Sequence, residues 1–152
     1  MDEPEFKKSA MIALLPITTD WCKISLPHMT LVYAGEIDKL SPGSFNELAK
    51  DACAIAMMNR VLTLEVLTKE QFGNWSDDPT KMVDVLRLRP NSELLAMRRT
   101  VEDWNKSEFP FNPHVTIGPV GQHVENQPRL LAFDRVLVGW GDEYLTFHLK
   151  RH

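Results

Sequence analysis

The residues of this chain whose types and spacing could do chemistry belong to one short motif that occurs twice. The stretches Pro27-His28-Met29-Thr30 and Pro113-His114-Val115-Thr116 each place a threonine two residues after a histidine that follows a proline. An apolar run follows each copy. Side chains alternate between the two faces of a strand, so the histidine and threonine of each copy are expected on one face, roughly 6.6 Å apart. That span suits the binding of one phosphate group.

Two histidines and two threonines meet the needs of phosphodiester hydrolysis without a metal. An attacking water must lose a proton, the leaving oxygen must gain one, and the non-bridging oxygens need hydrogen-bond donors as charge develops. With ordinary pKa values near 6.5, His28 and His114 can divide into one neutral base and one protonated acid near neutral pH. The hydroxyls of Thr30 and Thr116 supply the donors. These four residues are the predicted catalytic site.

Other interpretations of the same residues are weaker. Both histidines could simply bond to backbone groups while both threonines serve as ordinary strand residues. A metal site is disfavoured because neither histidine has an Asp, Glu or Cys at ligand spacing, so we expect no metal and no other cofactor. Cys22 and Cys53 have neither metal-ligand spacing nor a partner motif, which indicates reduced thiols.

The pattern along the chain predicts strands, a helix, strands, a second helix and further strands. Apolar runs and alternation predict strands over residues 10–15, 28–34, 61–67, 82–88, 115–117, 133–138 and 144–149. Apolar residues at helical spacing predict helices over 42–59 and 92–105. A loop is expected over 72–79. Each half thus holds a motif strand, one helix and an adjoining pair of strands, which favours one α+β domain over residues 1–152 with two lobes.

Composition limits the classes of function. The chain has 152 residues, a net charge of -4 and a pI near 5.7, which disfavours a general nucleic-acid binder with a basic face. No window has the apolar length of a signal peptide or a membrane span. We therefore expect a cytoplasmic monomer that makes no membrane contact and acts on a small or short anionic ligand.

The paired motifs resemble the 2H phosphoesterase superfamily, the LigT-like group, and the resemblance covers essentially the whole chain. It implies two pseudo-symmetric antiparallel sheets around a central cleft, with helices outside. It also implies metal-independent cleavage of 2′,3′-cyclic phosphates or 2′,5′-linked phosphodiesters of nucleotides or short RNA ends. His28, Thr30, His114 and Thr116 match the family motif residue for residue.

Substrate-binding residues are predicted outside the motifs. Lys81 precedes an apolar strand where family members often carry a basic residue, and Phe72 and Trp75 could stack on a base. Each has an alternative role, since Lys81 could be a solvated strand-edge residue and either aromatic ring could anchor its loop.

The resemblance extends to phage-encoded members, because the chain is compact and ends in a Trp-Gly-Asp-Glu-Tyr hairpin. An enzyme that degrades cyclic oligonucleotide signals of bacterial immunity is therefore an alternative. So is a protein that sequesters a nucleotide in the same cleft.

Overall fold

The computed structural model describes residues 8–22, 24–73, 82–121 and 127–151. Its strands are β1 (Ser9–Pro16), β2 (Met29–Glu36), β3 (Leu62–Phe72), β4 (Val83–Leu88), β5 (His114–Pro119), β6 (Leu130–Trp140) and β7 (Glu143–His148). Its helices are α1 (Ser44–Met58) and α2 (Ser92–Val101), with short 3-10 turns η1 (Ile37–Lys39) and η3 (Glu102–Trp104). The predicted α+β class and the predicted order of elements are confirmed.

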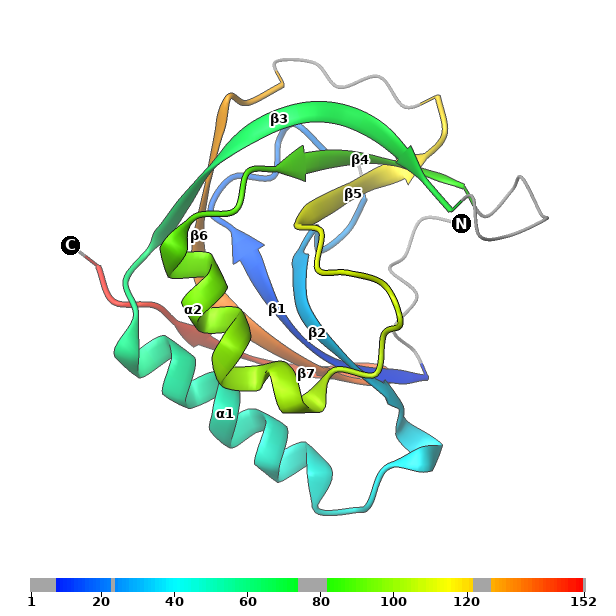
Figure 1. The fold of residues 1–152 in the computed structure, drawn as a ribbon, viewed down its shortest axis with the longest axis vertical. Helices are drawn as coiled ribbons and strands as arrows, with labels where there is room; N and C mark the ends of the chain where they lie inside the picture. Colours follow the sequence, from blue (N-terminus) through cyan, green and yellow to red (C-terminus); the bar gives the residue numbers. More distant parts are fainter. Residues whose placement is uncertain (1–7, 23, 74–81, 122–126, 152) are drawn as a thin grey trace.

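One long strand joins the two halves of the fold. The first residues of β3, Leu62 to Glu65, pair with β6, and its remainder pairs with β4. Every described strand pairing is antiparallel, and the strand order is β2-β1-β6-β3-β4-β5, with β7 paired to β6 as well. The two predicted sheets are therefore continuous through β3 (Figure 1).

The sheet curls until its two ends meet. β2 and β5 stand at opposite ends of the strand order, yet they contact each other in space (Figure 1). Each of these edge strands begins at one of the two motifs. Curling of the sheet is thus what brings the two halves of the predicted site together.

A single large core holds this shape. α1 packs on β6, β7 and β1, and α2 packs on β2 and on α1. The buried residues Leu48 and Ile55 of α1 and Leu94 and Met97 of α2 join the apolar side chains of the strands in that core. Burying a Leu or Ile side chain contributes about 1.5–3 kcal/mol, so the helix stripes predicted from spacing are a main source of stability.

Several predicted boundaries are wrong in instructive ways. The third strand runs to Phe72 rather than ending at residue 67, because its second half gains β4 as a partner. The second helix ends at Val101 and continues as the 3-10 turn η3 over Glu102–Trp104. The loop prediction over 72–79 lies mostly outside the described residues, as do Trp75 and Lys81.

Candidate active site

A strained backbone residue positions His28. Leu26 has a φ of 53°, in the left-handed region that a bulky side chain rarely adopts. Its carbonyl oxygen lies 3.1 Å from His28 Nδ1. Pro27, between them, is buried and disfavours helical geometry at Leu26. The strained turn therefore presents a hydrogen-bond acceptor to the ring.

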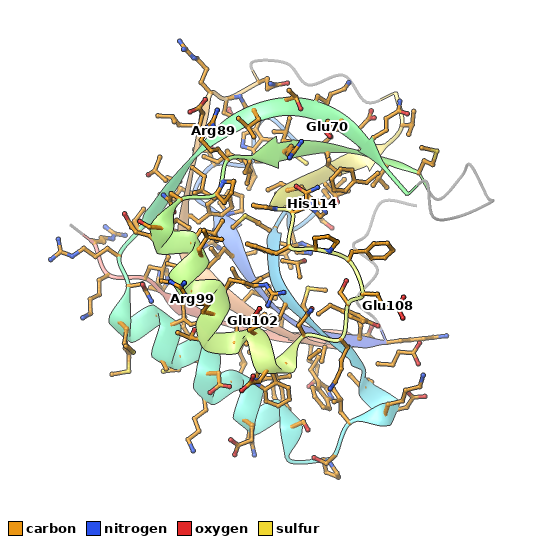
Figure 2. The ribbon with its side chains drawn as sticks, in the orientation of Figure 1. Glu70, Arg89, Arg99, Glu102, Glu108 and His114 are labelled. Atoms are coloured by element: carbon orange, nitrogen blue, oxygen red, sulfur yellow. The ribbon has the colours of Figure 1, made fainter. Side chains whose placement is uncertain are left out.

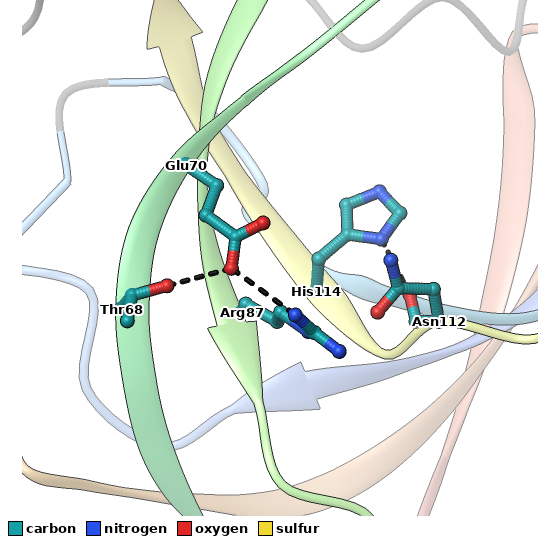
Figure 3. Close-up of polar contacts among 5 residues, drawn as sticks. All are labelled: Thr68, Glu70, Arg87, Asn112 and His114. Atoms are coloured by element: carbon teal, nitrogen blue, oxygen red, sulfur yellow. Dashed lines mark hydrogen bonds and ion pairs between the residues drawn. The ribbon is translucent and has the colours of Figure 1, made fainter.

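The second motif holds its histidine in the same way. His114 Nδ1 lies 2.7 Å from the carbonyl oxygen of Asn112, again two residues earlier and across a buried proline, Pro113 (Figure 3). A carbonyl oxygen only accepts, so Nδ1 must carry the proton in both rings. The neutral form of each ring then has its lone pair on Nε2, which can take a proton from a reactant.

Both motif pairs lie on the side of the sheet away from the main core. In β5, Val115 and Ile117 are core residues, so His114 and Thr116 point to the opposite face. In β2, Thr30 pairs with Ala13, which belongs to a separate small cluster on that opposite face.

A β-bulge follows Thr30. The register shifts so that Ile12 pairs with Val32, and both Leu31 and Val32 enter the core. Bulges are common beside active sites because they re-aim a side chain.

The charge of His114 affects the pKa of His28. Burial lowers the pKa of His28 from its ordinary value, the bond from the ring to Leu26 opposes this shift, and the positive charge of His114 lowers the pKa further. Burial also lowers the pKa of His114, against the effect of its bond to Asn112. Both rings are thus poised to be neutral near pH 7, in close enough proximity for charge repulsion.

Phe72 lies against the second motif. Its ring meets the His114 ring edge-on, with centroids 4.6 Å apart. The structure therefore places one of the three predicted substrate-binding residues beside a predicted catalytic residue. The other two, Trp75 and Lys81, lie outside the described residues.

Sequence reasoning missed a charged group beside His114. Arg87 of β4 is the register partner of His114, and its side chain is 46% exposed on the same face. Its Nη1 lies 3.4 Å from Glu70 Oε2, which also accepts the hydroxyl of Thr68 at 2.7 Å (Figure 3). The Thr68 hydroxyl first, and Arg87 in addition, lower the pKa of the Glu70 carboxyl. Only the register of β4 against β5 reveals that Arg87 neighbours His114.

Cys22 links the loop before the first motif to the strand of the second. Its thiol lies 3.9 Å from the carbonyl oxygens of both Thr116 and Ile117. Burial raises the pKa of this thiol, so it stays protonated and weakly nucleophilic. These contacts place the loop before the first motif against the strand of the second motif.

Within the described residues, no group of three or more His, Cys, Asp or Glu side chains is placed to hold a metal ion. No helix of the described residues is long and apolar enough to cross a membrane.

No protein-family model and no curated protein matches the chain. Solved structures do match. Escherichia coli LigT with bound 3′-AMP aligns at a TM-score of 0.55 and 16% identity, over 94% of this chain and 98% of LigT. Usb1 of Kluyveromyces marxianus aligns at a TM-score of 0.62 and 11% identity, over 96% of this chain and all of that one (100%). At this identity the likeness establishes the fold alone: the chain has a LigT-like fold.

Proposed function

We propose that the protein is a metal-independent phosphodiesterase that acts on 2′,3′-cyclic phosphates or 2′,5′-type linkages of nucleotides or short RNA ends. The observation that carries the proposal is the matched pair of histidines. Each is held through Nδ1 by a carbonyl two residues earlier, at the start of one of two edge strands that meet. A histidine with only a structural role would not require a second histidine held in the same way at the other strand.

In the proposed reaction, one ring takes a proton from water through Nε2 while the water oxygen bonds to phosphorus. The other ring, protonated, gives its proton to the departing sugar oxygen as the phosphorus–oxygen bond breaks. Each positioned proton-transfer group typically contributes about 10²- to 10⁴-fold in rate. The positive charge of His114 lowers the pKa of His28, so the two rings disfavour being protonated together, and one neutral base with one protonated acid is the division that the pair favours.

Donors for the phosphate come from both strands. The hydroxyls of Thr30 and Thr116 stand two residues after the histidines, where they can donate to non-bridging oxygens. Arg87, beside His114, adds a positive charge that stabilises the charge developing in the transition state. The Phe72 ring contacts the His114 ring and can also contact the sugar or base of the substrate.

A nucleotide is the substrate class that the fold supports best. LigT structures have been solved with 3′-AMP, ATP and NADP+. The net charge of -4 of this chain makes long RNA a poor substrate, because binding along a phosphate backbone relies on many basic contacts. A mononucleotide, a short RNA end or a small cyclic oligonucleotide presents only one or a few phosphates.

An assay of the purified protein tests this proposal. The panel holds 2′,3′-cyclic mononucleotides, 2′,5′-linked dinucleotides, RNA ends bearing a 2′,3′-cyclic phosphate, and cyclic di- and trinucleotides, each with and without a chelator. Turnover of at least one class that the chelator leaves unchanged supports the proposal, and the Arg87→Gln variant should slow it. Binding without any turnover at stoichiometric enzyme would instead indicate a sequestering protein.

A further inference from the structure

A pocket lies apart from the motif residues. It has a volume of about 390 Å³ and opens between α2 and the following strap, defined here as residues 105–111. None of the four motif residues lines it. Figure 2 shows Arg99 and Glu102 along the helical segment that forms one wall. Its volume falls within the range of small-molecule sites.

The Arg98 side chain lines this pocket, and two of its nitrogen atoms lack a hydrogen-bond acceptor. The residue is only 9% exposed, and its Nε and Nη1 atoms are buried without a hydrogen-bond partner. Its one described interaction is with the Phe111 ring, whose centroid lies 5.1 Å from the guanidinium carbon. A guanidinium is a permanent cation with a planar fork of donors that matches phosphate oxygens. A buried cation without an acceptor is costly, and because Arg98 is among the residues that line the pocket, an anion bound there would offset part of that cost through its charge.

The rest of the pocket indicates what the anion carries. Phe111 and Phe109 line the strap side, and Phe109 is 62% exposed although it is a large apolar residue. Such rings provide faces on which a flat ring can stack. The Glu102 carboxylate can accept hydrogen bonds from N–H groups of a ligand. Arg98 and Arg99 carry two positive charges against the one negative charge of Glu102, so the lining as a whole favours an anion.

Hydrogen bonds fix the first residues of the strap. The Asn105 side chain accepts from the Ser107 amide at 3.2 Å and donates to the Ser107 carbonyl at 3.2 Å, which closes a turn. The Lys106 amide donates to the Tyr33 carbonyl of β2 at 2.8 Å, which fixes the strap to the sheet. These bonds fix the start of the strap, from which the chain continues to Phe109 and Phe111.

We propose that this pocket is a second binding site, separate from the hydrolytic site, for a nucleoside monophosphate. The phosphate binds the Arg98 guanidinium, the base stacks on the phenylalanine rings of the strap, and the exocyclic amino group of the base donates to Glu102.

Titration with AMP, followed by calorimetry and by nuclear Overhauser effects, tests this site. We expect saturable binding below about 1 mM, with contacts between base protons and the ring protons of Phe109 or Phe111. Adenosine and inorganic phosphate, each lacking half of the ligand, should bind at least about 10-fold more weakly. Contacts of AMP with His114 or Phe72 alone would overturn the proposal.

Two variants and one control make the test specific. Arg98→Met replaces a buried unpaired cation by an apolar chain, so its Tm should not fall, whereas AMP affinity at the pocket should drop about 10- to 100-fold. Phe109→Ala alters an exposed ring and should weaken AMP but not inorganic phosphate. Arg60→Met, at an exposed arginine, removes the same charge elsewhere and should change nothing. Unchanged AMP affinity in Phe109→Ala, or in a folded Arg98→Met, would contradict the proposal.

Discussion

The chemistry of each histidine depends on one backbone carbonyl. Leu26 and Asn112 occupy equivalent places, two residues before His28 and His114, and their carbonyl oxygens take the Nδ1 protons. At Leu26 the backbone is held in a left-handed conformation, which costs on the order of 1–3 kcal/mol and persists only where the surroundings impose it. The strained residue thus supplies the carbonyl that orients the His28 ring.

The first prediction concerns the charge coupling between the two rings. Because the positive charge of His114 lowers the pKa of His28, His114→Gln should raise the pKa of His28 toward its ordinary value while burial still holds it below that value. A pH titration of the His28 Cε1 proton by NMR, in wild type and variant, measures this shift. An exposed histidine, His148, serves as the internal reference, and an unmoved His28 pKa would show that the rings do not interact.

Sequence reasoning at this scale found the residues that repeat and missed those that depend on register. The two Pro-His-x-Thr stretches can be recognised in the sequence because the same residue types recur at the same spacing. Arg87 carries no such signal: it lies in a strand of unremarkable alternation, and only its pairing with His114 gives it significance. Phe72 was expected in a loop, whereas it ends β3 and reaches the His114 ring.

At the scale of elements, hydrogen bonds between segments distant in sequence hold the helices in place. The Trp104 indole of η3 donates to Asp51 Oδ2 of α1 at 2.7 Å. Asn91 caps α2 by accepting the Leu94 amide at 2.9 Å, as its place before the helix predicts. The first helix has no such side-chain cap: Gly43 is its N-cap residue, and the Ser41 and Ser44 hydroxyls bond each other at 3.0 Å.

The second prediction concerns the bond between Trp104 and Asp51. Asp51→Ala leaves the half-buried indole N–H without its acceptor and should lower the free energy of unfolding by about 1–3 kcal/mol. Asp51→Asn keeps a side-chain oxygen there and should lose less. Urea denaturation of the three proteins compares them, and equal losses in both variants would show that the bond itself contributes nothing.

At the scale of the whole molecule, apolar spacing predicts the order of the elements, whereas only the two matching motifs predict that the two halves of the fold meet. Apolar spacing in the sequence identifies each strand and helix, since each must bury one face. No pattern of apolar residues predicts that β2 and β5, which stand at opposite ends of the strand order, contact each other. That closure follows from β3 serving both halves and from the loop contact of Cys22 with β5.

The third prediction is that stability depends on pH through the two histidines. Their pKa values are lower in the folded protein than the value near 6.5 of an unfolded chain. The unfolded state therefore binds more protons between these values, so the free energy of unfolding rises with pH there. The stabilisation is fully present above about pH 6.5 and is lost as the pH falls through the folded pKa values.

Denaturation of the wild type and of a His28→Gln, His114→Gln double variant, from about pH 7.5 to about pH 5, measures this dependence. The double variant should lose less stability on acidification. Parallel profiles for the two proteins would mean that other groups govern the acid response.

The central claim is that two histidines perform metal-independent hydrolysis, and single-turnover cleavage of the best substrate from the assay panel tests it most directly. The fourth prediction is that His28→Ala and His114→Ala each lower the rate by about 10²-fold or more, with chelator present throughout. The matched control, His148→Ala, removes an exposed histidine of β7 and should cleave at the wild-type rate. Wild-type cleavage by either motif variant, with its fold intact, would contradict the account.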